Sequence, residues 1–464
     1  MDLLQNPISY PSMMANRNWW MIGLLALAVG MASGSLRSTG QPPPPASPGQ
    51  SGAPMTAKEG SIAYQGVSSC ASVACHGGPI SSPSKWQSSY TAWVTKDPHA
   101  KAYSVLWEHR SKDIVRLLNG VDHPQRPEPW NDARCLACHS LHRSTADLSI
   151  ISDGVSCEAC HGAASNWLVP HTTAGWGKLL NDDKYTERFG MKNTKQLISR
   201  AEVCIGCHVG QSDSEAGSPR DVTHGLIAAG HPRLAFEFSA YMANMPPHWN
   251  AAAAHAAKNE ASAWIVGQAL TAQAANDLRA AHAAHGSIEF ADYDCYACHH
   301  ELQSESWRRM QSVARRDSRS APGELRLSTW YAGMFQRVLA LSNLKAATAP
   351  EAAKALEAWI NDQDAAGLRH IMADIATQGA DAVHWDDATQ CYLALLALDN
   401  ARRDDSESRD SGPSENDKRI RESIKLLNQE LTFPKALNSP RSYDPKQLQA
   451  EMRNLADLLT DKNN

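Results

Sequence analysis

Ten of the eleven cysteines in this chain form five closely spaced pairs, and a histidine directly follows the second cysteine of each pair. Four pairs enclose two residues, and the first pair encloses four. In chain order the motifs are Cys70–His76 (CASVACH), Cys135–His139 (CLACH), Cys157–His161 (CEACH), Cys204–His208 (CIGCH) and Cys295–His299 (CYACH). Paired cysteines in an exported chain often indicate disulfides, but a disulfide has no use for an adjacent imidazole. The repeat therefore predicts a fold that holds a metal or cofactor five times.

The spacing of the motifs suits covalent attachment of haem c. Cysteines three positions apart lie about one helical turn apart, so both thiols reach the two vinyl groups on one edge of a porphyrin. The histidine that follows then ligates the iron. We expect five haem c groups, attached at Cys70, Cys75, Cys135, Cys138, Cys157, Cys160, Cys204, Cys207, Cys295 and Cys298. The expected proximal iron ligands are His76, His139, His161, His208 and His299.

The first motif departs from this spacing because four residues separate its cysteines. One interpretation is an ordinary disulfide beside an unrelated histidine. Against it, the final Cys75-His76 step is kept, and Gly77 follows the histidine much as Gly162 follows His161. A looser loop accommodates the longer spacer, so we expect haem attachment here too.

The N-terminal segment carries an export signal. Residues 19–32 (WWMIGLLALAVGMA) form an apolar run that follows Arg17. Its length matches a signal peptide and falls short of the ~20 residues that span a bilayer. Residues 1–36 are therefore a cleaved signal peptide or a retained N-terminal anchor, which would tether the protein to the membrane. The Pro-, Ser- and Gly-rich residues 37–60 form a linker. We expect a periplasmic or otherwise exported protein.

Composition agrees with a globular haem protein. The 42% hydrophobic content and the net charge of −5 signal neither disorder nor a nucleic-acid partner. The chain has 14 Trp but only 6 Phe, and covalently held porphyrins would fill part of its core. We expect a mainly α fold with much irregular loop, in which residues 61–305 form a pentahaem cytochrome c domain and residues 306–464 a helical domain.

The C-terminal region has apolar residues at helical spacing. The stretches are 327–341, 368–375, 391–401, 420–431 and 448–459. Asp444-Pro445 is a favourable helix start, and Arg402–Lys418 is expected to be a charged loop. Before this region, the Ala-rich residues 251–285 also predict a helix. We interpret the C-terminal region as a small helical bundle without a ligand signature, which acts in packing or docking.

The eleventh cysteine, Cys391, lies in the apolar run CYLALLALD. Free cysteine packs as a small hydrophobe, so we expect a buried, unreactive thiol. An intermolecular disulfide is the alternative in an oxidising compartment.

Several local patterns resemble the cytochrome c-554 family, tetrahaem electron carriers of nitrifying bacteria. Trp93 is followed by Asp97-Pro98-His99-Ala100, which is similar to the family's Trp and His-Ala pair. The segment 154–162 (GVSCEACHG) is similar to the family's third haem motif, and His171 follows it as the family's distal histidine does. The resemblance covers residues 68–208.

The resemblance implies distal ligands for two haems and none for a third. His99 would ligate the haem iron of His161, and His171 that of His76. The haem of His139 would have no protein ligand at its sixth position. The chain departs from the family in its longer first spacer, the absence of Gly-Pro-Gly after the third motif, its fifth haem motif and its C-terminal helices.

Three histidines between the fourth and fifth motifs are candidate distal ligands for the remaining haems. His231 lies between Gly and Pro in an apolar segment and is the first choice, followed by His224 and His248. His255, His282 and His285 lie on the Ala-rich helix. They are interpreted as solvated, with the alternative that one of them serves the fifth haem.

Five haems attached within about 230 residues must lie close together, which favours electron transfer between a redox protein donor and acceptor. One alternative is a haem enzyme, an oxidoreductase that acts on a small nitrogen or sulfur species at an open iron. The pattern favours a carrier over an enzyme, because all five motifs end in His whereas pentahaem nitrite reductases bear one that ends in Lys. A structural or docking subunit of a larger complex is the third interpretation.

Overall fold

The computed structural model describes eleven parts of the chain. They are residues 62–120, 126–141, 148–179, 182, 188–212, 219–249, 258–286, 288–299, 325–407, 414–432 and 445–461. Within these ranges the chain is helical and forms no β-strand, as expected, and isolated β-bridges join Gln211 to Arg220 and Tyr293 to Leu327. The expected signal peptide or anchor and the linker, residues 1–60, lie outside the described residues.

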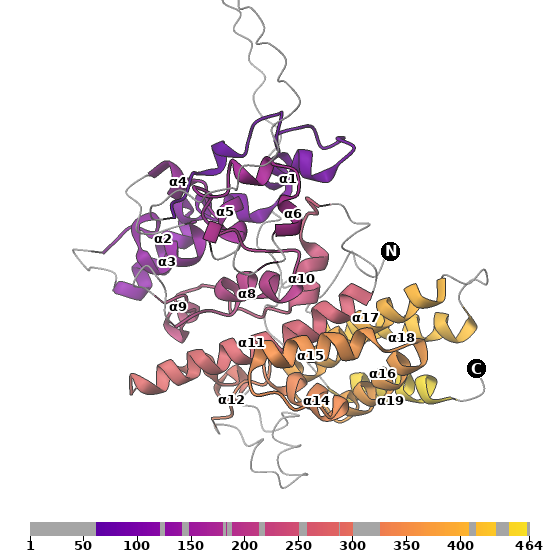
Figure 1. The fold of residues 1–464 in the computed structure, drawn as a ribbon. Coiled ribbons are helices and arrows are strands. Elements are labelled where there is room, and N and C mark those ends of the chain that lie inside the picture. Colours follow the sequence, from indigo (N-terminus) through magenta and orange to yellow (C-terminus); the bar gives the residue numbers. More distant parts are fainter. Residues whose placement is uncertain are drawn as a thin grey trace, which may run out of the picture.

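The motif-bearing half consists of short helices joined by irregular segments (Figure 1). Its α-helices are α1 (Ser89–Lys96), α2 (His109–Asn119), α3 (Ala133–His139), α4 (Leu148–Ser152), α5 (Cys157–His161), α6 (Trp176–Leu179), α8 (Leu197–His208), α9 (His224–Ala228), α10 (Phe238–Asn244) and α12 (Cys295–Cys298). Its 3₁₀ turns are η1 (Val67–Ser69), η2 (Lys85–Ser88), η3 (Pro98–Lys101), η4 (Ser104–Trp107), η5 (Pro129–Asn131), η6 (Pro170–Thr172) and η8 (Phe290–Asp292).

The regular motifs coincide with helices, which keeps their two cysteines one turn apart. Helices α3, α5 and α8 end at the motif histidine, and α12 covers Cys295–Cys298. Gly162 ends α5 with a φ of 83° and lies so close to the backbone that a Cβ there would meet the Gly190 carbonyl oxygen at 2.1 Å. Only glycine suits both conditions, so the glycine after this motif has a structural role.

Side chains of α8 and α10 join the large core of the helical bundle, and the rest of this half has three small clusters of buried side chains. These are Ala164, Trp167, Trp176 and Phe189; Leu106, Leu136 and Ile151; and Ile114, Leu226 and Ala229. A domain usually has one contiguous core. Divided clusters of this kind agree with a lobe in which large apolar groups other than side chains fill the interior.

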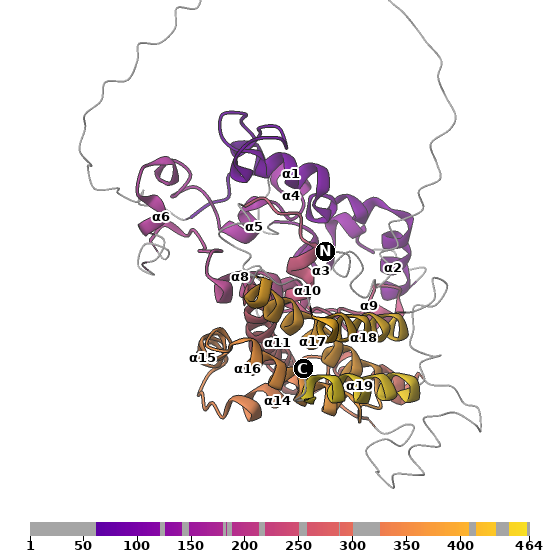
Figure 2. The ribbon, with the colours of Figure 1, turned by 90° about the vertical axis from the view of Figure 1, so that its right-hand side faces the viewer.

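A second half is a helical bundle with one large core. Its helices are α11 (Lys258–Ala284), α14 (Gly333–Ser342), α15 (Ala349–Asn361), α16 (Ala365–Gly379), α17 (Trp385–Glu407), α18 (Glu415–Leu431) and α19 (Pro445–Thr460). Figures 1 and 2 show α11 between the motif-bearing half and the C-terminal helices. Its residues Trp264, Ile265 and Val266 are fully buried in the core that α15–α19 complete.

The C-terminal helices agree with the expected stripes, with two corrections. The loop expected over Arg402–Lys418 is shorter, because α17 continues to Glu407 and α18 begins at Glu415. Arg402 is buried in α17 and pairs with Asp399 at 2.8 Å and Asp417 at 2.6 Å. The sequence also gave no prediction for α15, although Thr348 and Glu351 form a capping box at its start.

The expected burial of Cys391 is confirmed. The residue is 2% exposed within α17, and burial raises the pKa of its thiol to about 12. None of the described helices has both the length and the apolar character that crossing a bilayer requires.

Candidate haem ligand pairs

Ten histidine rings lie in five pairs, and each pair joins a motif histidine to a histidine from elsewhere in the chain. The distances between ring centres are 6.2 Å for His76–His171, 6.4 Å for His139–His231, 6.4 Å for His161–His248, 5.9 Å for His208–His99 and 6.2 Å for His299–His224. Every motif histidine therefore has one histidine opposite it.

This separation fits one metal ion between two imidazoles. A bond from a transition metal to an imidazole nitrogen is about 2 Å long, and the ring centre lies roughly 1 Å beyond that nitrogen. Two rings on opposite sides of one iron would thus have centres about 6 Å apart. Rings in van der Waals contact would stack more closely, so the common spacing suits a pair of axial haem ligands.

The hydrogen bonds of four rings support the same reading. Backbone carbonyl oxygens accept from the Nδ1 atoms: Trp86 from His76 at 2.7 Å, Ala102 from His139 at 2.7 Å, Leu168 from His171 at 2.6 Å and Pro232 from His231 at 2.9 Å. Because a carbonyl only accepts, Nδ1 must carry the proton in each ring. The lone pair of Nε2 is then free for a metal, and the ring orientation is held.

Two further motif rings are buried in a way that keeps them neutral. Burial, with a smaller contribution from nearby histidines, lowers the pKa of His161 and of His208 to about 4. A ligating imidazole must be deprotonated, so this environment favours the form that binds iron. The Nδ1 atom of His161 is buried and has no hydrogen-bond partner among the described residues.

Local structure positions the distal histidines. His171 lies in η6 directly after Pro170, and His99 lies in η3, where Asp97 caps the turn. Two candidate distal histidines lie at or close to the short helix α9: His224 is its first residue, and His231 follows Ala229 and Gly230 after its end. The turn before His231 is held by Arg110, whose guanidinium donates to the Gly230 carbonyl at 2.5 Å.

Two pairings differ from those that the family resemblance implies. His99 lies opposite His208 rather than His161, and His161 faces His248 instead. His139, whose haem iron the resemblance leaves open, has His231 opposite it at 6.4 Å. His171 and His76, which the resemblance pairs, have ring centres 6.2 Å apart.

Two of the three histidines expected to be solvated lie in the described part of the chain, His282 in α11 and His285 directly after it, and neither is paired with a motif histidine. His282 lies between two carboxylates, with Nε2 2.9 Å from Asp221 and Nδ1 2.8 Å from Asp292. His285 is exposed and its Nδ1 donates to the Ala281 carbonyl. His255 lies outside the described residues.

Some cysteines from different motifs lie side by side. The side chain of Cys70 is next to that of Cys157, and the side chain of Cys138 is next to that of Cys207. The first motif thus adjoins the third, and the second adjoins the fourth. Cys160 lies near Cys204 and Cys207, so the third and fourth motifs are neighbours as well.

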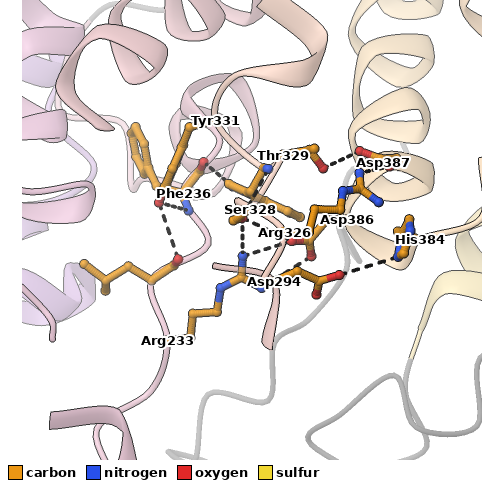
Figure 3. Close-up of polar contacts among 12 residues, drawn as sticks. Arg233, Phe236, Asp294, Arg326, Ser328, Thr329, Tyr331, His384, Asp386 and Asp387 are labelled. Atoms are coloured by element: carbon orange, nitrogen blue, oxygen red, sulfur yellow. Dashed lines mark hydrogen bonds and ion pairs between the residues drawn. The ribbon is translucent and has the colours of Figure 1, made fainter. Parts of the chain in front are cut away.

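A polar network that sequence reasoning missed fastens the fifth motif to the bundle. Figure 3 shows Arg233 against Asp386 at the start of α17, at 2.9 Å, and also against Ser328 at 3.1 Å. Asp294, directly before Cys295, pairs with His384 at 3.5 Å. The sequence could not reveal this network, because the residues that contact one another lie up to 153 positions apart in the chain.

Comparison with known proteins yields one family. Residues 69–162, which contain the first three motifs, match the model of the family described as cytochrome c554 and c-prime. No curated protein and no solved structure was found to match the chain. With the motifs and ring pairs above, the match shows that this protein is a c-type cytochrome that binds haem c covalently and resembles the cytochrome c554 and c-prime family.

Proposed function

We propose that this protein transfers electrons through five covalently attached haem c groups, each held by two histidines. The observation that carries the proposal is the set of five ring pairs with centres 5.9–6.4 Å apart, one at every cysteine motif. Haem c carries a single electron by alternating between the ferric and ferrous states. The chain's own part is to attach the groups, supply both axial ligands and exclude water.

Double histidine ligation favours a carrier over an enzyme. An iron that binds a substrate needs an open coordination position, whereas two protein ligands leave none. The ring of His231 opposite His139 is the decisive contact, because the family resemblance implies an open iron there. We therefore propose electron transfer, and reduction or oxidation of a small substrate becomes an outcome for the experiment below.

The contacts among the motifs support a single, unbranched path for electrons from one haem to the next. Neighbouring cysteine side chains join the first motif to the third, the second to the fourth and the third to the fourth. The fifth motif joins the second through α9 and the turn after it, which supply His224 and His231. The proposed order is first, third, fourth, second and fifth, with a redox protein at each end.

We also propose that the protein works outside the cytoplasm. Covalent haem attachment is combined in this chain with an apolar N-terminal segment of signal-peptide length. If that segment is retained, it tethers the haem-bearing part to the membrane through the linker of residues 37–60. The partners are then a redox donor and acceptor on the same side of the membrane.

Mass spectrometry and electron paramagnetic resonance test the proposal together. The intact exported protein should exceed its polypeptide mass by five haems, and the oxidised protein should give low-spin signals alone. A mass that fits four haems would remove the first motif from the set. A high-spin ferric signal, with spectral changes on adding cyanide or nitric oxide, would instead favour the enzyme.

A further inference from the structure

One of the ten paired rings has an environment unlike the others. The Nδ1 of His99 lies 2.8 Å from a carboxylate oxygen of Asp97, whereas four other rings donate to backbone carbonyls. Of the ten paired rings, all of which lie in the described part of the chain, His99 is the one that contacts a carboxylate. A charged acceptor makes a stronger hydrogen bond than a neutral one.

The aspartate is held so that it keeps this contact. Asp97 is 5% exposed, and the same oxygen accepts the backbone N–H of His99 at 3.0 Å. It caps η3, with Pro98 at the first position of the turn. Asp97 and His99 are separated by Pro98 alone, and the backbone contact holds them together. The imidazole of His99 therefore has little freedom to rotate away.

We propose that Asp97 is a positioning residue that holds His99 as the axial ligand opposite His208 and lowers the reduction potential of that haem. The inference rests on the proposed double histidine ligation. A carboxylate on the outer nitrogen makes the imidazole a stronger electron donor. A stronger donor and a nearby negative charge both stabilise ferric iron over ferrous iron, so the midpoint potential falls.

The neighbouring third motif offers an internal contrast. The ring of His161 has a buried Nδ1 without a hydrogen-bond partner among the described residues, so its donor strength is not raised. The charge of Asp97 also acts on His248, which faces His161. Removing that charge should therefore move the haem of His208 most and the haem of His161 less, and both toward higher potential.

The test is a potentiometric titration of the full-length, haem-loaded Asp97→Asn variant. Asparagine keeps the size and an accepting oxygen but removes the charge. Outer-shell partners of metal ligands are worth about tenfold or more in an equilibrium constant. We expect one of the five one-electron midpoints to rise by at least about 59 mV, which is tenfold for one electron.

Asp132→Asn is the matched control. Asp132 is 4% exposed and caps α3 through the backbone N–H of Arg134, as Asp97 caps η3, but its side chain pairs with Arg134 rather than with an imidazole. Its variant should leave the midpoint of the haem of His208 unchanged. Asp97→Ser, which also caps without charge, replaces the asparagine variant if that one does not assemble.

Haem number and ligand number are measured on the same samples by mass and by low-spin signals. This separates failure of the tuning from failure of the proposed function. If a variant of Asp97 carries the full set of low-spin haems and no midpoint rises relative to the wild type and the Asp132 control, the proposal is overturned.

Discussion

At the scale of single residues, the outer nitrogen of each ligating imidazole sets how well the inner nitrogen binds iron. His139 and His231 both donate Nδ1 to carbonyls, of Ala102 and Pro232, and so present matched Nε2 atoms to the space between them. Neither carbonyl belongs to a side chain, so substitution does not readily change these contacts. The orientation of both rings is therefore set by backbone carbonyls.

Substitution of His231 by alanine should therefore open one haem. With the ring gone, the iron opposite His139 loses a ligand, and one haem in five should become high-spin and bind cyanide. Its potential should rise as well, because a donor is lost. His285→Ala, on an exposed ring that faces no motif, is the control and should stay low-spin. Low-spin signals alone in both variants would mean that His231 is not the distal ligand.

The sequence indicates which histidines are candidate iron ligands, but it does not indicate which two histidines face each other. The ten histidines stand out in the sequence through the motifs, the family resemblance and a cluster before the fifth motif. Which histidine faces which depends on how distant segments fold together: His99 and His208 are far apart in the chain, yet their ring centres lie 5.9 Å apart. No local pattern encodes that proximity.

At the scale of elements, helices do two kinds of work in this protein. Short helices hold the motif cysteines, and the segment of α9 and the turn after it brings His224 and His231 opposite two different motif histidines. The long helices follow apolar stripes, which is why their existence was predictable. The extension of α17 to Glu407 was not, because ion pairs of Arg402 and Arg403 with Asp399 stabilise a segment whose composition resembles a loop.

His282 gives α11 a contact whose strength depends on pH. Burial alone would lower its pKa, but hydrogen bonds to Asp292 and Asp221 outweigh burial and raise the pKa above its usual 6.5. A group with a raised folded pKa contributes its full stability below the unfolded pKa and loses it as the pH rises through the folded pKa. The contact should thus stabilise the protein most in mild acid.

Denaturant titrations of the wild type and of His282→Gln across this range measure the effect. The difference between their midpoints should be largest at or below about pH 6.5 and should shrink as the pH rises. His285→Gln serves as the comparison for loss of an imidazole nearby, since the ring of His285 contacts a backbone carbonyl. A constant difference for His282→Gln would contradict the assigned ion pairs.

At the scale of the whole molecule, α11 belongs to both halves. The sequence assigns it to the haem domain because it precedes the fifth motif, and the boundary at residue 305 lies outside the described residues. In the structure α11 shares a buried core with α8 and α10 on one side and α15–α17 on the other. Periodicity could not reveal this, because a helix that is buried on several faces has no single apolar stripe.

This arrangement predicts that the haem-bearing half is not stable alone. A chain that ends at residue 324, still with its export signal, would keep all five motifs but lose α15 and α17, which pack against the buried part of α11 around Trp264, Ile265 and Val266. Burying a side chain of this kind contributes about 1.5–3 kcal/mol. Exposing several of them would therefore cost a substantial part of a typical free energy of unfolding of about 5–15 kcal/mol. We expect an aggregated or protease-sensitive product with incomplete haem ligation.

The matched control removes residues 1–60 instead, with a cleavable export signal supplied in their place, and leaves the buried face of α11 covered. Size-exclusion chromatography, proteolysis and the low-spin signals should then be those of the full protein. The decisive comparison is at the pair His299–His224, because the network of Arg233, Asp386 and Asp294 ties the fifth motif to α17. Loss of the C-terminal helices should disturb this haem most. A truncated chain that stays monomeric with five low-spin haems would show instead that the bundle is an independent appendage.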